Sequence, residues 1–128
     1  MPAGLVVNPA SGKDIRRLTG KASVFDNREK LAIVKRALAG TVSGGLSHLY
    51  YMDDAHGIAH TAIAESALPR SIKVERIPTP KTSSALDTLA AAEAFSQTDC
   101  NVVMTLGGDG TNRAFVKGWR DANLIPLS

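Results

Sequence analysis

Residues 101–113 have the sequence NVVMTLGGDGTNR and contain the most informative transition in the chain. The segment Asn101–Leu106 is typical of a short buried strand, and the residues after the turn have the composition of a helix that ends near Trp119. Between the two lies a glycine-rich turn at residues 107–110. A buried strand that enters a helix through a tight turn is a building unit of parallel α/β sheets.

The same alternation of strand and helix signals continues along the rest of the chain. Asp26 and Glu29 have the spacing of a capping box at the start of the first helix, and Gly40 is expected to end that helix. Strands that alternate with helices imply right-handed crossovers, so we expect an α/β fold: a three-layer, Rossmann-like, mostly parallel sheet with helices on both faces. The other expected strands are Leu5–Asn8, Leu46–Met52, Ile72–Ile77 and Leu124–Leu127, and the other expected helices are Ile58–Ala67 and Ser84–Phe95.

Length and composition indicate one ordinary globular domain, residues 1–128. The sequence has 44% hydrophobic and 21% charged residues, which argues against disorder. The single cysteine, Cys100, has no intramolecular partner for a disulfide, so a reducing compartment is the simpler expectation. No apolar run approaches the roughly 18 residues that span a bilayer, and the N-terminus lacks signal-peptide features, so we expect a cytoplasmic protein without a membrane partner.

The charge balance is mildly basic. A net charge of +3 favours anionic ligands only in a general way. Aromatic residues make up 5% of the chain and offer few platforms on which bases could stack, so no nucleic-acid partner is expected.

In an open parallel sheet, the loops that leave the carboxyl ends of the strands gather along one edge, where ligands bind. This topology makes Asn8 and Asp109 plausible neighbours although they are far apart in sequence. The four loops expected at this edge are Asn8–Lys13, Asp53–Gly57, Thr79–Thr82 and Gly107–Asn112.

The glycine-rich turn suits a phosphate group, because glycines let backbone N–H groups approach a ligand and the following helix presents its positive end. Asp109 is then unusual, since a carboxylate repels phosphate unless it holds a metal ion, accepts a proton from a hydroxyl nucleophile, or bonds the turn itself. The simpler alternative is an ordinary strand-to-helix turn in which Asp109 or Thr111 caps the helix.

Two motifs carry a resemblance to a known superfamily. Residues 107–111, GGDGT, resemble the signature of the NAD kinase and diacylglycerol/sphingosine lipid kinase superfamily, and residues 8–13, NPASGK, resemble its companion NPxSGK loop. The run from residue 8 to residue 27 is most similar to the ATP-NAD kinase-like branch that includes acetoin-catabolism X proteins. The resemblance covers essentially the whole chain and implies a phosphofructokinase-like α/β fold.

The resemblance also implies a phosphotransferase site for ATP and Mg²⁺, with NAD as the expected acceptor and a lipid or sugar as the alternative. Asp109 would take the catalytic role, either deprotonating the acceptor hydroxyl or organising magnesium. No residue is assigned as a direct metal ligand. Lys13 could supply a positive charge to the nucleotide, and a solvated lysine in a loop is an equally good interpretation of it. The nucleotide-binding residues implied are Asn8, Ser11, Gly12, Lys13, Gly107, Gly108, Gly110, Thr111 and Asn112.

In the superfamily, a second, β-rich domain with acceptor contacts normally follows the first, and residues 1–128 are expected to correspond to the first domain only. The sequence is therefore expected to be the N-terminal half of a two-domain kinase, and kinase activity of this chain alone is doubtful. A non-catalytic nucleotide sensor and a flavodoxin-like interaction domain are the alternatives, and a homo-oligomer is compatible with the sequence.

Several other polar residues are weaker candidates for a functional site, and each also has a simple structural interpretation. His56 and His60 are four residues apart, yet surface or capping histidines are favoured over a metal site. The pair Asp53 and Asp54 could bind magnesium or a ribose, but acidic pairs after strands are commonly turns. Cys100 precedes a strand and is expected at the edge of the sheet opposite the ligand.

Arg16, Arg17 and Lys21 form a loose basic cluster. These residues could attract an anionic ligand, but a solvated helix face explains them equally well.

Overall fold

The structure is a computed structural model that describes residues 1–8, 20–54, 56–79, 85–107 and 109–127, with the side chains of residues 20–26, Ala85 and Asp109 left out of the description. Its strands are β1 (Pro2–Val7), β2 (His48–Met52), β3 (Lys73–Ile77), β4 (Val102–Leu106) and β5 (Leu124–Leu127). Its helices are α2 (Gly20–Ser43), α3 (Ile58–Glu65), α4 (Ala85–Phe95) and α5 (Asp109–Gly118).

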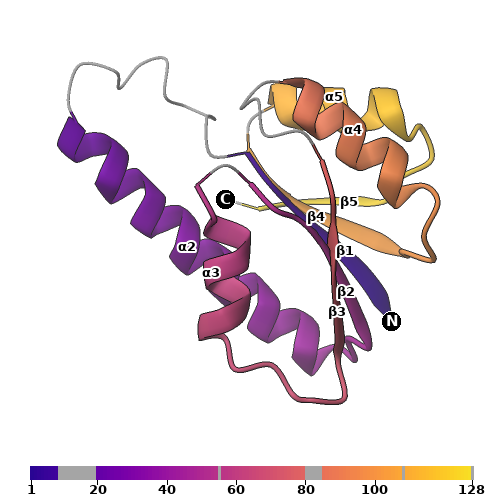
Figure 1. The fold of residues 1–128 in the computed structure, drawn as a ribbon, viewed down its shortest axis with the longest axis horizontal. Coiled ribbons are helices and arrows are strands. Elements are labelled where there is room, and N and C mark those ends of the chain that lie inside the picture. Colours follow the sequence, from indigo (N-terminus) through magenta and orange to yellow (C-terminus); the bar gives the residue numbers. More distant parts are fainter. Residues whose placement is uncertain (9–19, 55, 80–84, 108, 128) are drawn as a thin grey trace.

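The strands form one parallel sheet in the order β3-β2-β1-β4-β5. Helices α2 and α3 lie together on one face of the sheet, and α4 and α5 lie together on the other (Figure 1). The α/β fold with a parallel, Rossmann-like sheet between two helical layers is therefore confirmed. The order places β1 in the middle of the sheet, with β2 on one side and β4 on the other.

Two hydrophobic clusters fill the spaces above and below the sheet, because successive side chains of a strand point to opposite faces. On the side of α2 and α3, Leu5 and Val7 of β1 belong to one cluster. On the side of α4 and α5, Val6 belongs to the other, where the rings of Phe95 and Phe115 lie 6.0 Å apart. A strand buried on both faces has a continuous apolar sequence, which is why Leu5–Val7 has no polar alternation.

The first described helix differs from its prediction at both ends. Asp26 and Glu29 lie inside α2, which already includes Gly20, so the predicted capping box is wrong. Gly40 does not end the helix either, because one glycine inside a helix costs only about 1 kcal/mol relative to alanine. The residues after it still pack on the core, as Val42 does.

The end of α2 is set by Gly45, whose φ of +100° lies in the left-handed region. The amide of Leu46 donates to the carbonyl of Thr41 at 3.1 Å, and the amide of Gly45 donates to the carbonyl of Val42 at 3.1 Å. These two bonds form a Schellman motif, which satisfies carbonyls at the end of a helix. None of the helices in the described part of the chain is long and apolar enough to cross a membrane.

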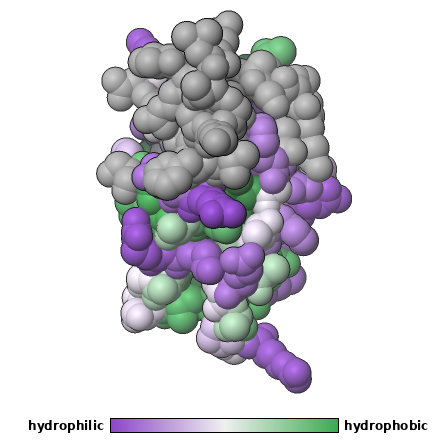
Figure 2. All heavy atoms as spheres, turned by 90° about the vertical axis from the view of Figure 1, so that its left-hand side faces the viewer, coloured by the Kyte–Doolittle hydropathy of each residue, from purple (hydrophilic) through white to green (hydrophobic). Residues whose placement is uncertain are grey.

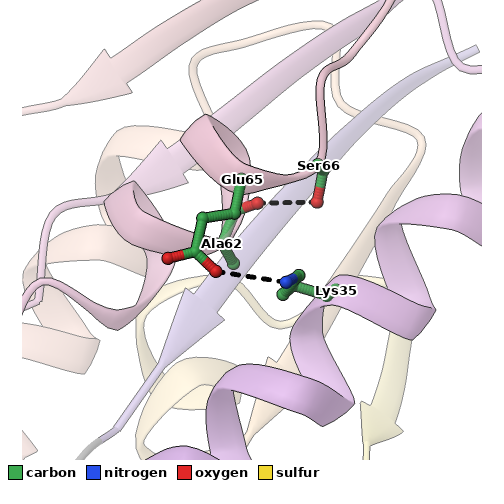
Figure 3. A network of polar contacts seen from close by, with 4 residues as sticks. All are labelled: Lys35, Ala62, Glu65 and Ser66. Carbon is green, nitrogen blue, oxygen red and sulfur yellow. Dashed lines mark hydrogen bonds and ion pairs between the residues drawn. The ribbon is translucent and has the colours of Figure 1, made fainter.

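Helices α2 and α3 are joined at their surface by an ion pair. The Lys35 ammonium lies 3.1 Å from Oε1 of Glu65, and the Ser66 hydroxyl donates to the carbonyl of Ala62 at 2.6 Å just beyond (Figure 3). Both charged side chains are exposed, so the pair contributes at most about 1 kcal/mol. The packing of these helices therefore depends mainly on the buried apolar residues beneath them.

Candidate functional site

The strand order reverses between β1 and β4. The helix that follows β1 in sequence, α2, lies on one face of the sheet, and the helix that follows β4, α5, lies on the other, so the chain diverges to opposite faces after these two strands (Figure 1). The carboxyl ends of both strands are held together there, since the amide of Asn8 donates to the carbonyl of Leu106 at 2.8 Å. In open α/β sheets, this divergence creates the crevice in which ligands bind.

A side-chain hydrogen bond crosses the reversal point. Nδ2 of Asn8 donates to Oγ1 of Thr111 at 2.8 Å, joining residues that are 103 positions apart in the sequence. Thr111 is only 5% exposed and lies in the first turn of α5. The structure thus brings together the end of β1 and the start of α5, the two segments that carry the sequence motifs.

A second bond fixes the same helical turn to the sheet. The hydroxyl of Thr105, which is 1% exposed in β4, donates to Oδ1 of Asn112 at 2.6 Å. Sequence reasoning missed Thr105. The available signal was a hydroxyl inside the otherwise apolar strand VVMTL, because a buried polar group needs a hydrogen-bond partner.

The glycines of the turn have different surroundings. A Cβ atom on Gly107 would lie 2.7 Å from Cβ of Thr111 and would also collide with Oγ1 of that residue. A Cβ atom on Gly110 would meet none of the described atoms within 4 Å, and Gly110 is exposed. Gly107 is therefore required by the packing of Thr111, whereas Gly110 leaves open space at the start of α5.

The backbone places Asp109 at the first residue of α5, but its side chain lies outside the described part of the structure. The first N–H groups of any helix have no partner within the helix and carry a partial positive charge. The start of α5 is therefore suited to anionic oxygens. The remaining predicted residues outside the described ranges are Ser11, Gly12, Lys13, Gly108, Arg16 and Arg17, together with the side chain of Lys21.

The acidic pair after β2 has a structural role. Asp54 is 3% exposed, and its two carboxylate oxygens accept hydrogen bonds from the amides of Ile58 at 2.9 Å and Ala59 at 2.8 Å. It therefore caps α3. Oδ2 of Asp53 lies 3.6 Å from a guanidinium nitrogen of Arg76 in the neighbouring strand β3. Each carboxylate of the pair therefore has a structural contact: Asp54 caps α3, and Asp53 pairs with Arg76 across to β3.

The two candidate histidines and the cysteine have the following surroundings. Nδ1 of His60 lies 3.5 Å from the hydroxyl of Tyr51, and His56 is exposed in the turn before α3. Within the described ranges, no group of three or more histidine, cysteine, aspartate or glutamate residues could hold a metal ion. Cys100 is buried ahead of β4, and burial raises the pKa of its thiol to about 11, which keeps it protonated and a poor nucleophile.

The fold and this site define a class of protein: a parallel α/β domain of Rossmann-like strand order with a glycine-containing, helix-opening turn at its reversal point. The chain is 32% identical, over 98% of its length, to acetoin catabolism protein X of Cupriavidus necator. It spans 35% of the length of that relative. No protein-family profile matches the chain. No solved structure matches it.

The similarity to this relative supports the resemblance to acetoin-catabolism X proteins. The alignment covers nearly the whole chain, as the resemblance in sequence motifs had indicated. Membership of the NAD kinase superfamily stays a prediction.

Proposed function

We propose that this chain is the nucleotide-binding domain of an ATP-dependent phosphotransferase. The observation that carries the proposal is the hydrogen bond between Asn8 and Thr111, because it joins the two motif segments at the reversal point of a parallel sheet. The similarity to a longer relative supports the view that residues 1–128 form one domain of a larger protein.

The phosphates of the nucleotide would lie against the first turn of α5. Gly110 leaves that turn open on its exposed side, and the helix end contributes a favourable potential for anions. The Oγ1 atom of Thr111 and the Oδ1 atom of Asn112 are both engaged in hydrogen bonds that hold the turn. Asn112 would therefore offer its amide group to the ligand, and Thr111 would act mainly by positioning the helix.

The proposed reaction transfers the γ-phosphoryl group of ATP to a hydroxyl group, for which NAD is our first choice of acceptor. The acceptor oxygen forms a bond to the γ-phosphorus, the bond to the leaving ADP oxygen breaks, and Asp109 receives the hydroxyl proton. Such transfer depends mostly on positioning and charge neutralisation, which a fixed helix end supplies. Ser11, Gly12 and Lys13 would complete the phosphate wall opposite α5.

Magnesium fits this site as a companion of the nucleotide. Mg²⁺ is commonly held by one or two carboxylates together with substrate phosphates. The described residues provide no cluster of three ligating side chains, so the nucleotide phosphates and water would supply most of the Mg²⁺ ligands. When bound, Mg²⁺ would neutralise charge that develops on the phosphate oxygens.

Calorimetric titration with ATP and Mg²⁺ tests the binding step. We expect Asn8→Ala and Thr111→Val to weaken ATP binding about tenfold or more, because each removes one end of the bond that sets the position of α5. Asn123→Ala is the matched control, since it removes an asparagine bond to the carbonyl of Asn101, the residue just before β4. Wild-type protein that does not bind ATP would refute the proposal.

Phosphoryl transfer is tested by incubating the larger protein to which this domain is proposed to belong with ATP, Mg²⁺ and NAD and measuring the phosphorylated product. Asp109→Asn should bind ATP with similar affinity but reduce turnover by a factor of about 100 or more. Wild-type protein that binds ATP and forms no product would favour the second candidate, a nucleotide-binding module. That candidate is supported by the share of the relative's length that the chain spans, 35%, because the contacts to an acceptor would then lie outside residues 1–128.

A further inference from the structure

A groove of about 260 Å³ lies between α2 and the start of α3, on the opposite face of the sheet from α5. Figure 2 shows the side of the molecule that carries these two helices, where hydrophobic atoms are exposed between hydrophilic ones. The groove belongs to the helical layer that the proposed nucleotide turn does not use. The described residues that line it are Asn27, Arg28 and Leu31 from α2, and His56, Ile58 and Thr61 from α3 and the turn before it.

The lining combines an apolar wall with a cation. Leu31 and Ile58 supply the apolar part, and Ile58 is only 5% exposed. Arg28 is exposed and is the one permanently charged residue among the described residues of the lining, none of which is acidic. An organic anion would therefore find a guanidinium group there with no carboxylate among the described lining residues, and guanidinium pairs well with carboxylate and phosphate oxygens.

The side-chain oxygen of Asn27 adds a second requirement for the ligand, a hydrogen-bond donor. Oδ1 of Asn27 is buried and has no hydrogen-bond partner, although buried polar atoms in folded proteins are nearly always paired. A hydroxyl group on the ligand would satisfy it. The amides at the start of α3 do not take part, because Asp54 already occupies those of Ile58 and Ala59.

The size of the groove limits the ligand. Pockets for drug-sized molecules usually exceed about 300 Å³, so this groove suits a molecule with only a few carbon atoms. We propose that the groove binds a small hydroxylated organic anion, with its charged group on Arg28, its hydroxyl on Asn27 and its carbon chain against Leu31 and Ile58. This site goes beyond the proposed nucleotide function, and competition with ATP tests whether the two overlap.

Calorimetric titration of the intact chain with four related probes tests the proposal: 3-hydroxybutyrate, butyrate, 3-hydroxybutyl phosphate and the neutral butane-1,3-diol. We expect at least one hydroxylated anion to bind with a dissociation constant of about 1 mM or lower, and the diol to bind at least about tenfold more weakly. The stronger of the two hydroxylated anions identifies carboxylate or phosphomonoester as the preferred class.

Two variants locate the site. Arg28→Gln should weaken binding of the preferred anion about tenfold or more, whereas Arg36→Gln should change it less than about twofold, because Arg36 is exposed on the same helix outside the groove. Asn27→Leu should abolish the preference for 3-hydroxybutyrate over butyrate. All three positions lie on α2, and thermal unfolding of each variant establishes that it is folded.

The proposal is overturned if neither hydroxylated anion binds, if the diol binds as tightly as the anions, or if both arginine variants weaken binding equally. Displacement of the anion by ATP would also overturn it, because the groove would then belong to the nucleotide site. Failure of the chain to bind ATP, with the anion still bound, would refute the proposed function and leave this inference intact.

Discussion

At the scale of single residues, the glycines of the GGDGT turn serve different ends. Gly107 lacks a side chain because Thr111 packs directly against its α-carbon, and this contact places Oγ1 of Thr111 within reach of Asn8. Gly110 meets no such neighbour. The glycines of the motif look equivalent in sequence, but only Gly107 is required by the packing of a neighbouring side chain, whereas Gly110 has room for one.

Alanine substitutions separate these roles. Gly107→Ala should lower the free energy of unfolding by about 1 to 3 kcal/mol, because the added methyl group overlaps Thr111. Gly110→Ala should raise it by about 0.5 to 1 kcal/mol, because alanine is favoured over glycine inside a helix. Urea denaturation measures both changes, and equal effects at the two positions would contradict the assignment.

At the scale of elements, α3 depends on a cap that lies outside it. Its N-cap residue is Gly57, which has a positive φ of 68° and no side chain to bond the helix amides. Asp54, three residues earlier, performs that function with both carboxylate oxygens. The helix has only eight residues, so the loss of this cap affects a large share of its backbone bonds.

Asp54→Ala should therefore lower the free energy of unfolding by about 1 to 2 kcal/mol, since it leaves two buried amides without an acceptor. Asp53→Ala is the adjacent control and should have a smaller effect, because the ion pair of Asp53 is with Arg76, whose side chain is exposed. Urea unfolding of the two variants provides the comparison, and the reverse order of stability would refute the capping role.

At the scale of the whole molecule, a hydrogen bond links strands on the two sides of β1. The hydroxyl of Tyr50 in β2 donates to Oδ1 of Asp99, just before β4, at 2.6 Å. Gly4 is paired with both Tyr50 and Val103 in the sheet, and a Cβ atom there would lie 3.2 Å from Sγ of Cys100. The absence of a side chain on the central strand leaves this region of the sheet free for the bond.

The hydrogen bond to Asp99, together with burial, raises the pKa of Tyr50 from 10.0 to about 12. A raised pKa stabilises the folded state while the phenol is protonated, so the contribution is complete below about pH 10 and is lost as the pH rises toward 12. Ultraviolet titration of the tyrosines should show a midpoint near 12 that Tyr50→Phe removes. A wild-type titration without this midpoint would contradict the prediction.

Much of the architecture could be predicted from sequence, because each element has a local signal. The transition from β4 through the glycine turn to α5 follows from an apolar run, a glycine cluster and a helical composition. The start of α2 could not be predicted in this way, since Asp26 and Glu29 satisfy a capping pattern that the longer helix overrides. Asn8 was predicted as a site residue, but Thr105 was not, because its partner Asn112 is identified only by the packing of α5 on the sheet.

The sequence by itself determined the alternation of strands and helices, and with it a parallel sheet with a glycine turn between β4 and α5. The strand order β3-β2-β1-β4-β5 was decided by the tertiary structure, because strands buried on both faces have continuous apolar sequences that do not encode which neighbour each one pairs with. The bond between Asn8 and Thr111 likewise exists only once β1 lies beside β4 and carries residues 103 positions apart to the same edge.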